Sequence, residues 1–141
     1  MSSIWFQAPK IEVLNRQMEN TACSNLGIAV IELGDDYITG TMPADARTFQ
    51  PMGLIHGGSN VLLAETLGSI AANCCVDVSQ EYCVGQEINA NHIRGVRSGI
   101  VTGTAKLVHK GRTSQVWEIR IVNEQNKLTC ISRLTMAVVK R

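Results

Sequence analysis

Residues 59–76 form the one long stretch of this sequence in which apolar and small side chains follow one another almost without a charge. The apolar residues cover nearly the whole circumference of a helix, and a helix that is apolar all round is normally buried inside its domain. Gly68 and several alanines would let other backbone approach it closely. The segment therefore predicts one long central helix that the rest of the chain must enclose.

Strand patterns flank this helix on both sides. Residues 27–33 and 37–42 are rich in β-branched side chains and are separated by Gly-Asp-Asp, which favours a hairpin. Further strand-like runs cover residues 82–93, 99–108, 113–122 and 128–139, and the turn residues 123–126 predict a hairpin loop between the last two. Apolar residues at helical spacing predict a short amphipathic helix over residues 10–24. This order predicts the α+β class, with an antiparallel sheet of about six strands wrapped around the central helix.

Length and composition fit a single domain over residues 1–141. The chain has 141 residues, of which 45% are apolar, and this is enough for one core. Its 13 basic and 12 acidic residues give a net charge of +1 without any run of like charge, which argues against a nucleic-acid binder or an anionic-membrane binder. Charged residues make up only 18%, below the usual share of about a quarter, so we expect part of the surface to be buried against a second copy of the chain.

Cysteine usage and the first residues indicate the compartment. The 5 cysteines are odd in number and lack CxxC spacing, so we expect reduced thiols in a cytoplasmic protein. The first residues lack the apolar core of a signal peptide, and no run approaches the roughly 20 apolar residues of a membrane span. The histidines and cysteines show no metal-ligand spacing, and phosphate-binding glycine motifs are absent, so we expect neither a metal nor a cofactor.

Two glycines mark the start of the predicted helix, directly after His56. Gly57 and Gly58 would let a ligand approach the backbone closely and would leave amide N–H groups free at the positive end of the helix dipole. Such amides can hold a carbonyl oxygen or an oxyanion. The same residues could also form a plain loop-to-helix turn, with His56 in a structural hydrogen bond.

Glu65 is the only charged side chain between Gly57 and Asp77. A lone carboxylate on an apolar helix is expensive to bury and is rarely kept without a partner or a role. We predict that it acts as a general base, with Ser69 one turn further along the same face and able to hydrogen-bond to it. The alternative is a carboxylate satisfied by a backbone N–H or by an arginine.

Helix geometry limits how these features can cooperate. Glu65 comes eight residues after Gly57, so at about 1.5 Å per residue it lies roughly 12 Å further along the helix. The two groups of one chain therefore cannot act on the same carbonyl. If both act on one substrate, they must come from different subunits, and we expect a two-fold dimer with antiparallel central helices and shared sites.

A third group of residues carries positive charge. His92 and Arg94 lie at the end of one predicted strand, and residues 109–114 form a basic hairpin with a central glycine. Cations and flexible backbone of this kind suit phosphate groups. An ordinary solvated hairpin is also compatible with the pattern. No Ser-His-Asp or Cys-His arrangement is visible, and Cys74 and Cys75 fit small buried side chains.

Longer motifs resemble those of a known family. Residues 50–58 are QPMGLIHGG and residues 64–69 are AETLGS, and together they closely resemble the hotdog-fold acyl-CoA thioesterases that carry a glutamate on the central helix. The branch that acts on aromatic acyl-CoAs, such as 1,4-dihydroxy-2-naphthoyl-CoA, is also similar at residues 84–85, 87–92, 115–117 and 132–135. The resemblance therefore covers nearly the whole chain.

This resemblance implies dimers, usually paired into homotetramers, and hydrolysis of an acyl-CoA, such as a hydroxynaphthoyl or benzoyl thioester, to the free acid and CoA without a cofactor. The Gly57 amide would polarise the thioester carbonyl, and Glu65 of the neighbouring subunit would be the nucleophile or the general base. His56 and Gln50 would be arranged around the carbonyl, and Ser69 would orient the water or the carboxylate. The residues that would hold CoA are Gly85, His92, Arg94, His109, Gly111, Arg112, Thr113 and Ser114.

Two other functions fit parts of the same pattern. A hotdog-fold hydratase or dehydratase would use His56 and Glu65 as its acid–base pair. A non-catalytic acyl-CoA-binding module would need the pocket but no carboxylate at position 65. For the acyl pocket we expect walls from the N-terminal helix and from Met52, Leu54, Leu62 and Leu63.

Overall fold

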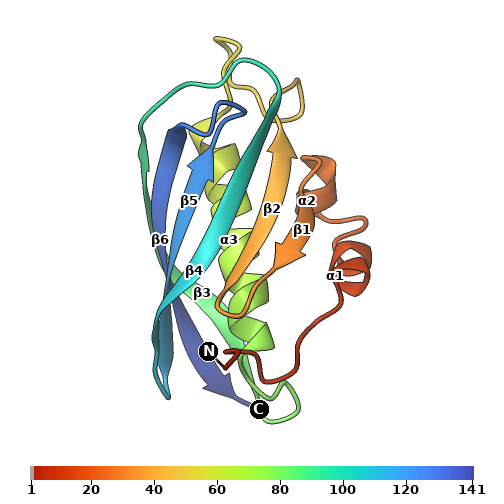
Figure 1. The fold of residues 1–141 in the computed structure, drawn as a ribbon, viewed down its shortest axis with the longest axis vertical. Helices are drawn as coiled ribbons and strands as arrows, with labels where there is room; N and C mark the ends of the chain where they lie inside the picture. The colour runs from red at the N-terminus through yellow and green to blue at the C-terminus, as the bar shows by residue number, and fades with distance from the viewer. Residues whose placement is uncertain (1) are drawn as a thin grey trace.

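The computed structural model describes residues 2–141 and places the long helix against one face of an antiparallel sheet (Figure 1). The chain runs through α1 (Ile11–Gln17), α2 (Ala22–Asn25), β1 (Ala29–Leu33), β2 (Tyr37–Pro43), α3 (Gly57–Cys74), β3 (Glu81–His92), β4 (Ile100–Lys110), β5 (Ser114–Val122) and β6 (Leu128–Lys140). The strands lie in the order β1-β2-β4-β5-β6-β3, so β1 and β3 form the two edges. Within the described residues this is the predicted sheet around one central helix.

The sheet packs on α3 through side chains at alternate strand positions. The fully buried positions of β5 are Gln115, Trp117, Ile119 and Ile121. The indole N–H of Trp117 donates to Oε1 of Gln115 (2.9 Å), so these buried polar atoms satisfy each other. Gly68 of α3 faces β6, where a Cβ would lie 2.5 Å from Cδ2 of Leu134. Glycine at this position therefore permits the close approach of helix and sheet.

The prediction that the central helix is buried all round is wrong for one of its faces. Leu63, Ala64 and Leu67 are fully buried against the sheet. On the opposite face, beyond the first turn, the residues that stay partly exposed are Val61, Leu62, Glu65, Thr66, Ser69, Ile70, Asn73 and Cys74. The sheet encloses α3 from one side only, and the N-terminal residues that line the other side leave cavities there. Among residues 2–141, no helix combines the length and apolar character needed to cross a membrane.

The N-terminal helix differs from the prediction as well. In place of one helix over residues 10–24, the structure has α1 and α2, separated by Asn20 in the left-handed region (φ 61°) and by the capping box of Thr21. Asn15 fixes α1 to β1, because its Nδ2 donates to the carbonyl of Val30 (2.9 Å) and its Oδ1 accepts the N–H of Val30 (2.8 Å). The N-terminal region is therefore a fixed wall beside α3.

The two hairpins predicted from turn residues are confirmed. β1 pairs with β2 around the Gly-Asp-Asp turn, and β5 pairs with β6 around residues 123–127. Oδ1 of Asn123 closes the second loop by accepting the N–H groups of Gln125 and Lys127 (3.0 and 2.9 Å). A local side-chain-to-backbone bond of this kind is what makes the second turn predictable from sequence.

Candidate active site

The start of α3 follows from its His-Gly-Gly sequence. His56 is the N-cap (φ −63°, ψ 134°), and its Nδ1 accepts the N–H of Gly58 (2.8 Å). Its carbonyl accepts the amides of Ser59 and Asn60 (2.9 and 3.2 Å). The N–H of Gly57 has no acceptor among residues 2–141. This amide is therefore free for a ligand at the positive end of the helix dipole.

His92, the last residue of β3, lies against Gly57. A Cβ on Gly57 would be 2.8 Å from Nε2 of His92, so the imidazole fills the space that a side chain at position 57 would need. Arg94 follows two residues later and is exposed. The structure thus brings His92, predicted to contact CoA, to the amide predicted to bind the carbonyl.

Glu65 lies on the open face of α3 beside Gly85 of β3. A Cβ on Gly85 would collide with Oε2 of Glu65, so the carboxylate packs directly on the glycine backbone. Here β3 carries a bulge between Gly85 and Glu87, a device that re-aims a strand next to functional sites. Contrary to expectation, Glu65 is only partly buried, because it lines a cavity of about 590 Å³ beside α1 and α2. The carboxylate therefore faces a space large enough for a substrate group.

Ser69 lies one turn after Glu65 on the same face of α3. Its Oγ donates to Sδ of Met136 (3.7 Å), and its carbonyl accepts Nδ2 of Asn73 (2.9 Å). Within the described part of the chain no hydrogen bond joins Ser69 to Glu65. The predicted Ser69–Glu65 bond is therefore not formed in this structure, although both side chains line the same cavity.

Gln50 lies in the loop that leads to α3. Its Oε1 accepts the N–H of Met52, and its own N–H donates to the carbonyl of Leu54 (2.8 Å). Nη1 of Arg97 donates to the carbonyl of Met52 (3.4 Å) and joins this loop to the segment after β3. In this structure the Gln50 carboxamide stabilises its own turn, and its placement around the carbonyl remains a prediction.

The predicted CoA hairpin is the turn between β4 and β5, closed by the N–H of Gly111 donating to the carbonyl of Ser114 (2.8 Å). The hairpin residues singled out above are His109, Gly111, Arg112, Thr113 and Ser114. Next to them, Nε2 of Gln115 donates to the carbonyl of Ala72 (3.4 Å), so the hairpin lies near the C-terminal end of α3. His92 lies at the other end of that helix. The two groups predicted to hold CoA are therefore apart within one chain.

Burial holds three of the cysteine thiols in their neutral form. Burial raises the pKa of Cys75 to about 12 and the pKa values of Cys74 and Cys83 to about 11. The thiolate is the reactive form of cysteine, so these residues are poor nucleophiles near neutral pH. Across residues 2–141, no three His, Cys, Asp or Glu side chains come together as metal ligands.

The walls of the cavity beside Glu65 match the expected pocket in part. Leu62 and the N-terminal helix line it as predicted, whereas Leu63 is fully buried under the sheet and Met52 is 74% exposed on its loop. Wall residues not anticipated from the sequence are Val61 and Thr66 of α3. The contact between Glu65 and Gly85 could have been suspected from the sequence, because an isolated glycine within a strand often marks a place where another group packs directly on the backbone.

Comparison with known proteins identifies the family of this chain. A profile of the family described as the thioesterase superfamily matches residues 52–130. The chain is 46% identical over 136 residues to the 1,4-dihydroxy-2-naphthoyl-CoA hydrolase of Escherichia coli (96% of this chain, 99% of the relative) and to the proofreading thioesterase EntH of Cronobacter sakazakii (96% and 98%). The crystal structure of a glutamine-to-alanine mutant thioesterase from Pseudomonas aeruginosa matches with a TM-score of 0.97 at 52% identity, over 99% of this chain and 100% of that one. This chain therefore belongs to the thioesterase superfamily and is a thioester hydrolase with the hotdog fold.

Proposed function

We propose that this protein hydrolyses acyl-CoA thioesters, with the Glu65 carboxylate and the Gly57 amide of two different subunits acting on one carbonyl. The observation that carries the proposal is the arrangement on α3. A carboxylate lies at an apolar cavity on the open face, and an unpaired N–H lies at the positive end of the same helix. These are the two groups that acyl transfer requires, an activated nucleophile and a donor to the developing oxyanion.

Helix geometry supports the use of two subunits. Gly57 and Glu65 belong to one straight helical segment, and eight residues at about 1.5 Å each separate them by roughly 12 Å. Reacting groups must approach within about 3–3.5 Å. One chain cannot supply both groups to the same carbonyl.

The edge strand β3 offers a way to pair the subunits. It carries Gly85 against Glu65 and His92 against Gly57. If two β3 strands pair antiparallel so that Gly85 faces the partner's His92, the Glu65 carboxylate lies beside the partner's Gly57. The two-fold axis would pass between residues 88 and 89. This register would bring the contact at the first residue of α3 and the contact at its middle into one site, and a dimer of dimers would extend the same arrangement.

The chemistry follows from these positions. The thioester carbonyl oxygen accepts the Gly57 N–H, which polarises the carbonyl and stabilises the oxyanion as it forms. The Glu65 carboxylate either attacks the carbonyl carbon, giving a mixed anhydride that water then cleaves, or removes a proton from an attacking water. Both routes expel the CoA thiolate and yield the free acid and CoA. Nδ1 of His56 is occupied by the Gly58 amide, so its other ring nitrogen is the one available to the substrate.

The proposal also assigns the other site residues, the acyl group and the compartment. Gln50 and Ser69 orient the carbonyl and the attacking group, and the cations around Arg94 and in the hairpin of residues 109–114 hold the phosphates of CoA. An apolar cavity beside Glu65 suits an aromatic acyl group such as a benzoyl or hydroxynaphthoyl group. Free cysteines without a disulfide are in keeping with a cytoplasmic enzyme.

Glu65→Gln tests the proposal, because it keeps the shape of the side chain and removes its charge. We expect turnover of benzoyl-CoA to fall by about a hundredfold or more, since the nucleophile or base is lost. Glu118→Gln on the outer side of β5 is the matched control and should leave turnover unchanged. Release of CoA thiol measures both variants, and elution volume verifies assembly. Near-normal turnover of folded Glu65→Gln would contradict the assignment.

A further inference from the structure

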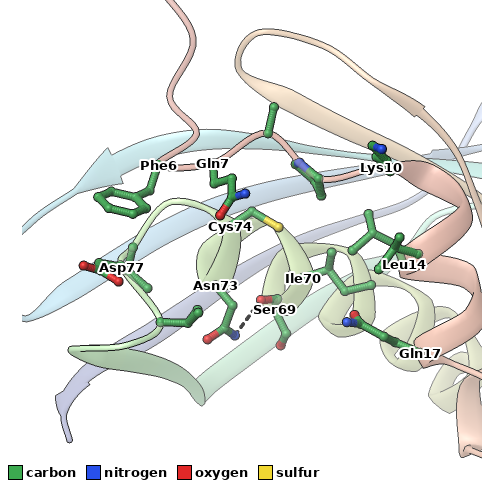
Figure 2. A pocket seen from close by; sticks show the side chains of 15 residues that line it. Phe6, Gln7, Lys10, Leu14, Gln17, Ser69, Ile70, Asn73, Cys74 and Asp77 are labelled. Carbon is green, nitrogen blue, oxygen red and sulfur yellow. Dashed lines mark hydrogen bonds between the residues drawn. The ribbon is translucent and has the colours of Figure 1, made fainter.

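Asn73 joins the C-terminal half of α3 to the edge strand β3. Its Oδ1 accepts the N–H of Cys83 (2.8 Å), and its Nδ2 donates to the carbonyl of the same residue (3.1 Å). Figure 2 shows a third bond, in which Nδ2 donates to the carbonyl of Ser69 one turn earlier on the helix (2.9 Å). One carboxamide therefore binds both peptide groups of a strand residue and is itself held by the helix that carries it.

The place of Cys83 in the sheet shows what these bonds do. β3 is an edge strand that pairs with β6, where Cys83 lies opposite Val138. Because both peptide groups of Cys83 bond to Asn73, they point to the open side of the edge, and the carboxamide takes the place of a neighbouring strand there. A weaker bond from Sγ of Cys83 to the carbonyl of Ala72 (3.6 Å) joins the same two elements. This end of β3 is therefore fixed to the helix as well as to the sheet.

Gly85 comes two residues after Cys83, on the same face of the strand. A Cβ on Gly85 would collide with Oε2 of Glu65, so even a small movement of this backbone changes the space open to the carboxylate. The bulge between Gly85 and Glu87 follows directly and interrupts the regular ladder. The position of Gly85 therefore depends on the segment before it, which Asn73 anchors.

We infer that Asn73 is a positioning residue, which keeps the Glu65 carboxylate in place for the reaction. By fixing Cys83 to α3, it holds Gly85 against that carboxylate. The inference rests on the proposed function and adds a residue that acts through the backbone of β3, because Oδ1 and Nδ2 of Asn73 are bonded within the protein. Catalytic groups must be held within about 0.5 Å of their productive geometry, and a misplacement of about 1 Å can lower the rate by about a hundredfold.

Two substitutions remove the carboxamide. Asn73→Ala should fold, because Asn73 is half-buried and water can reach the peptide groups of Cys83 in its place. Asn73→Leu removes the same bonds and keeps a side chain of similar size. The matched control is Asn123→Ala, since Oδ1 of Asn123 also binds two backbone N–H groups, but in the turn between β5 and β6. The measurements are kcat and KM with benzoyl-CoA, the melting temperature, and exchange of the Cys83 amide hydrogen.

Both Asn73 variants should lower kcat by about tenfold or more, change KM by less than about threefold and speed exchange at Cys83. Asn123→Ala should lower the melting temperature and leave kcat within about twofold. The Glu65→Gln background supplies a result that a merely structural role would not give. In that background, Asn73→Ala should change the residual kcat by less than about twofold, because the carboxylate that it positions is already absent.

Three results would each overturn the inference. They are unchanged exchange at Cys83, kcat within about twofold of the unmodified protein in the folded Asn73 variants, and an equal loss of kcat with and without the Glu65 carboxylate. Failure of the proposed function is distinguishable, because Glu65→Gln alone would then keep near-normal turnover whatever the Asn73 variants do.

Discussion

The Gly57 amide can be removed with little disturbance to the helix it begins. Gly57 is the first residue of α3, where the N–H has no partner within the helix and where proline is favoured. The preceding His56 has φ −63° and ψ 134°, the extended conformation that a residue before proline adopts. Gly57→Pro should therefore fold and keep α3 while deleting one N–H group.

Gly57→Ala is the matched control for this change. Both substitutions add a Cβ, which would lie 2.8 Å from Nε2 of His92, so the alanine variant controls for the movement of the exposed imidazole that this Cβ requires. Only proline removes the hydrogen-bond donor. Loss of one oxyanion donor lowers kcat by about 100- to 1000-fold, or about 2.7–4 kcal/mol of transition-state stabilisation. We therefore expect kcat of Gly57→Pro to be lower than kcat of Gly57→Ala by this factor.

Release of CoA thiol from benzoyl-CoA gives kcat and KM, and thermal unfolding gives the stability of each variant. The effect should appear mainly in kcat, because the N–H binds the oxyanion more strongly than the ground-state carbonyl. If Gly57→Pro is folded and turns over within about threefold of Gly57→Ala, this amide is not the oxyanion donor.

Two further experiments test the proposed site, and a third tests the buried cysteines. Mixing inactive Glu65→Ala and Gly57→Pro subunits should restore activity after exchange, because each hybrid dimer regains one intact site; a mixture that stays inactive while hybrids form would argue against shared sites. Gly85→Ala should displace the Glu65 carboxylate and lower kcat more than it raises KM, and unchanged kinetics would contradict the packing at Gly85. Burial raises the pKa of Cys75 to about 12 and of Cys83 to about 11, from 9.0, so the folded state binds these protons more tightly than the unfolded state. Their contribution to stability should be complete below about pH 9 and should be lost as the pH rises through about 11 for Cys83 and about 12 for Cys75, which denaturant unfolding at several pH values can measure.

The elements of the fold were predictable because their signals are local. Alternation in β5 and the turn chemistry at Asn123 specify a strand and a hairpin within a few residues of sequence. Gly68 in an apolar helix indicated close packing, and the structure gives the reason at Leu134. The helix predicted from residue 59 begins two residues earlier in the structure, at Gly57, because His56 caps it.

The open face of α3 was not predictable in the same way. The sequence pattern is the same whether an apolar residue such as Ile70 packs on a sheet or lines a ligand cavity. Periodicity depends only on where the apolar residues are and not on what they contact. The split of the N-terminal helix at Asn20 depends on a left-handed residue that the pattern over residues 10–24 conceals. The contact of Glu65 with Gly85 depends on the register of β3 and on its bulge, which are tertiary properties.

The edge strand β3 links the catalytic proposal to assembly. Its Gly85 touches one catalytic candidate and its His92 touches the other, so a single antiparallel pairing of two such edges brings both to one carbonyl. An exposed edge strand is ordinarily a liability that proteins shield. On this proposal the exposed edge persists because pairing completes the site, and activity should therefore fall with dilution in parallel with dissociation of the dimer. If a variant held monomeric kept full turnover, pairing of β3 would not be needed to complete the site.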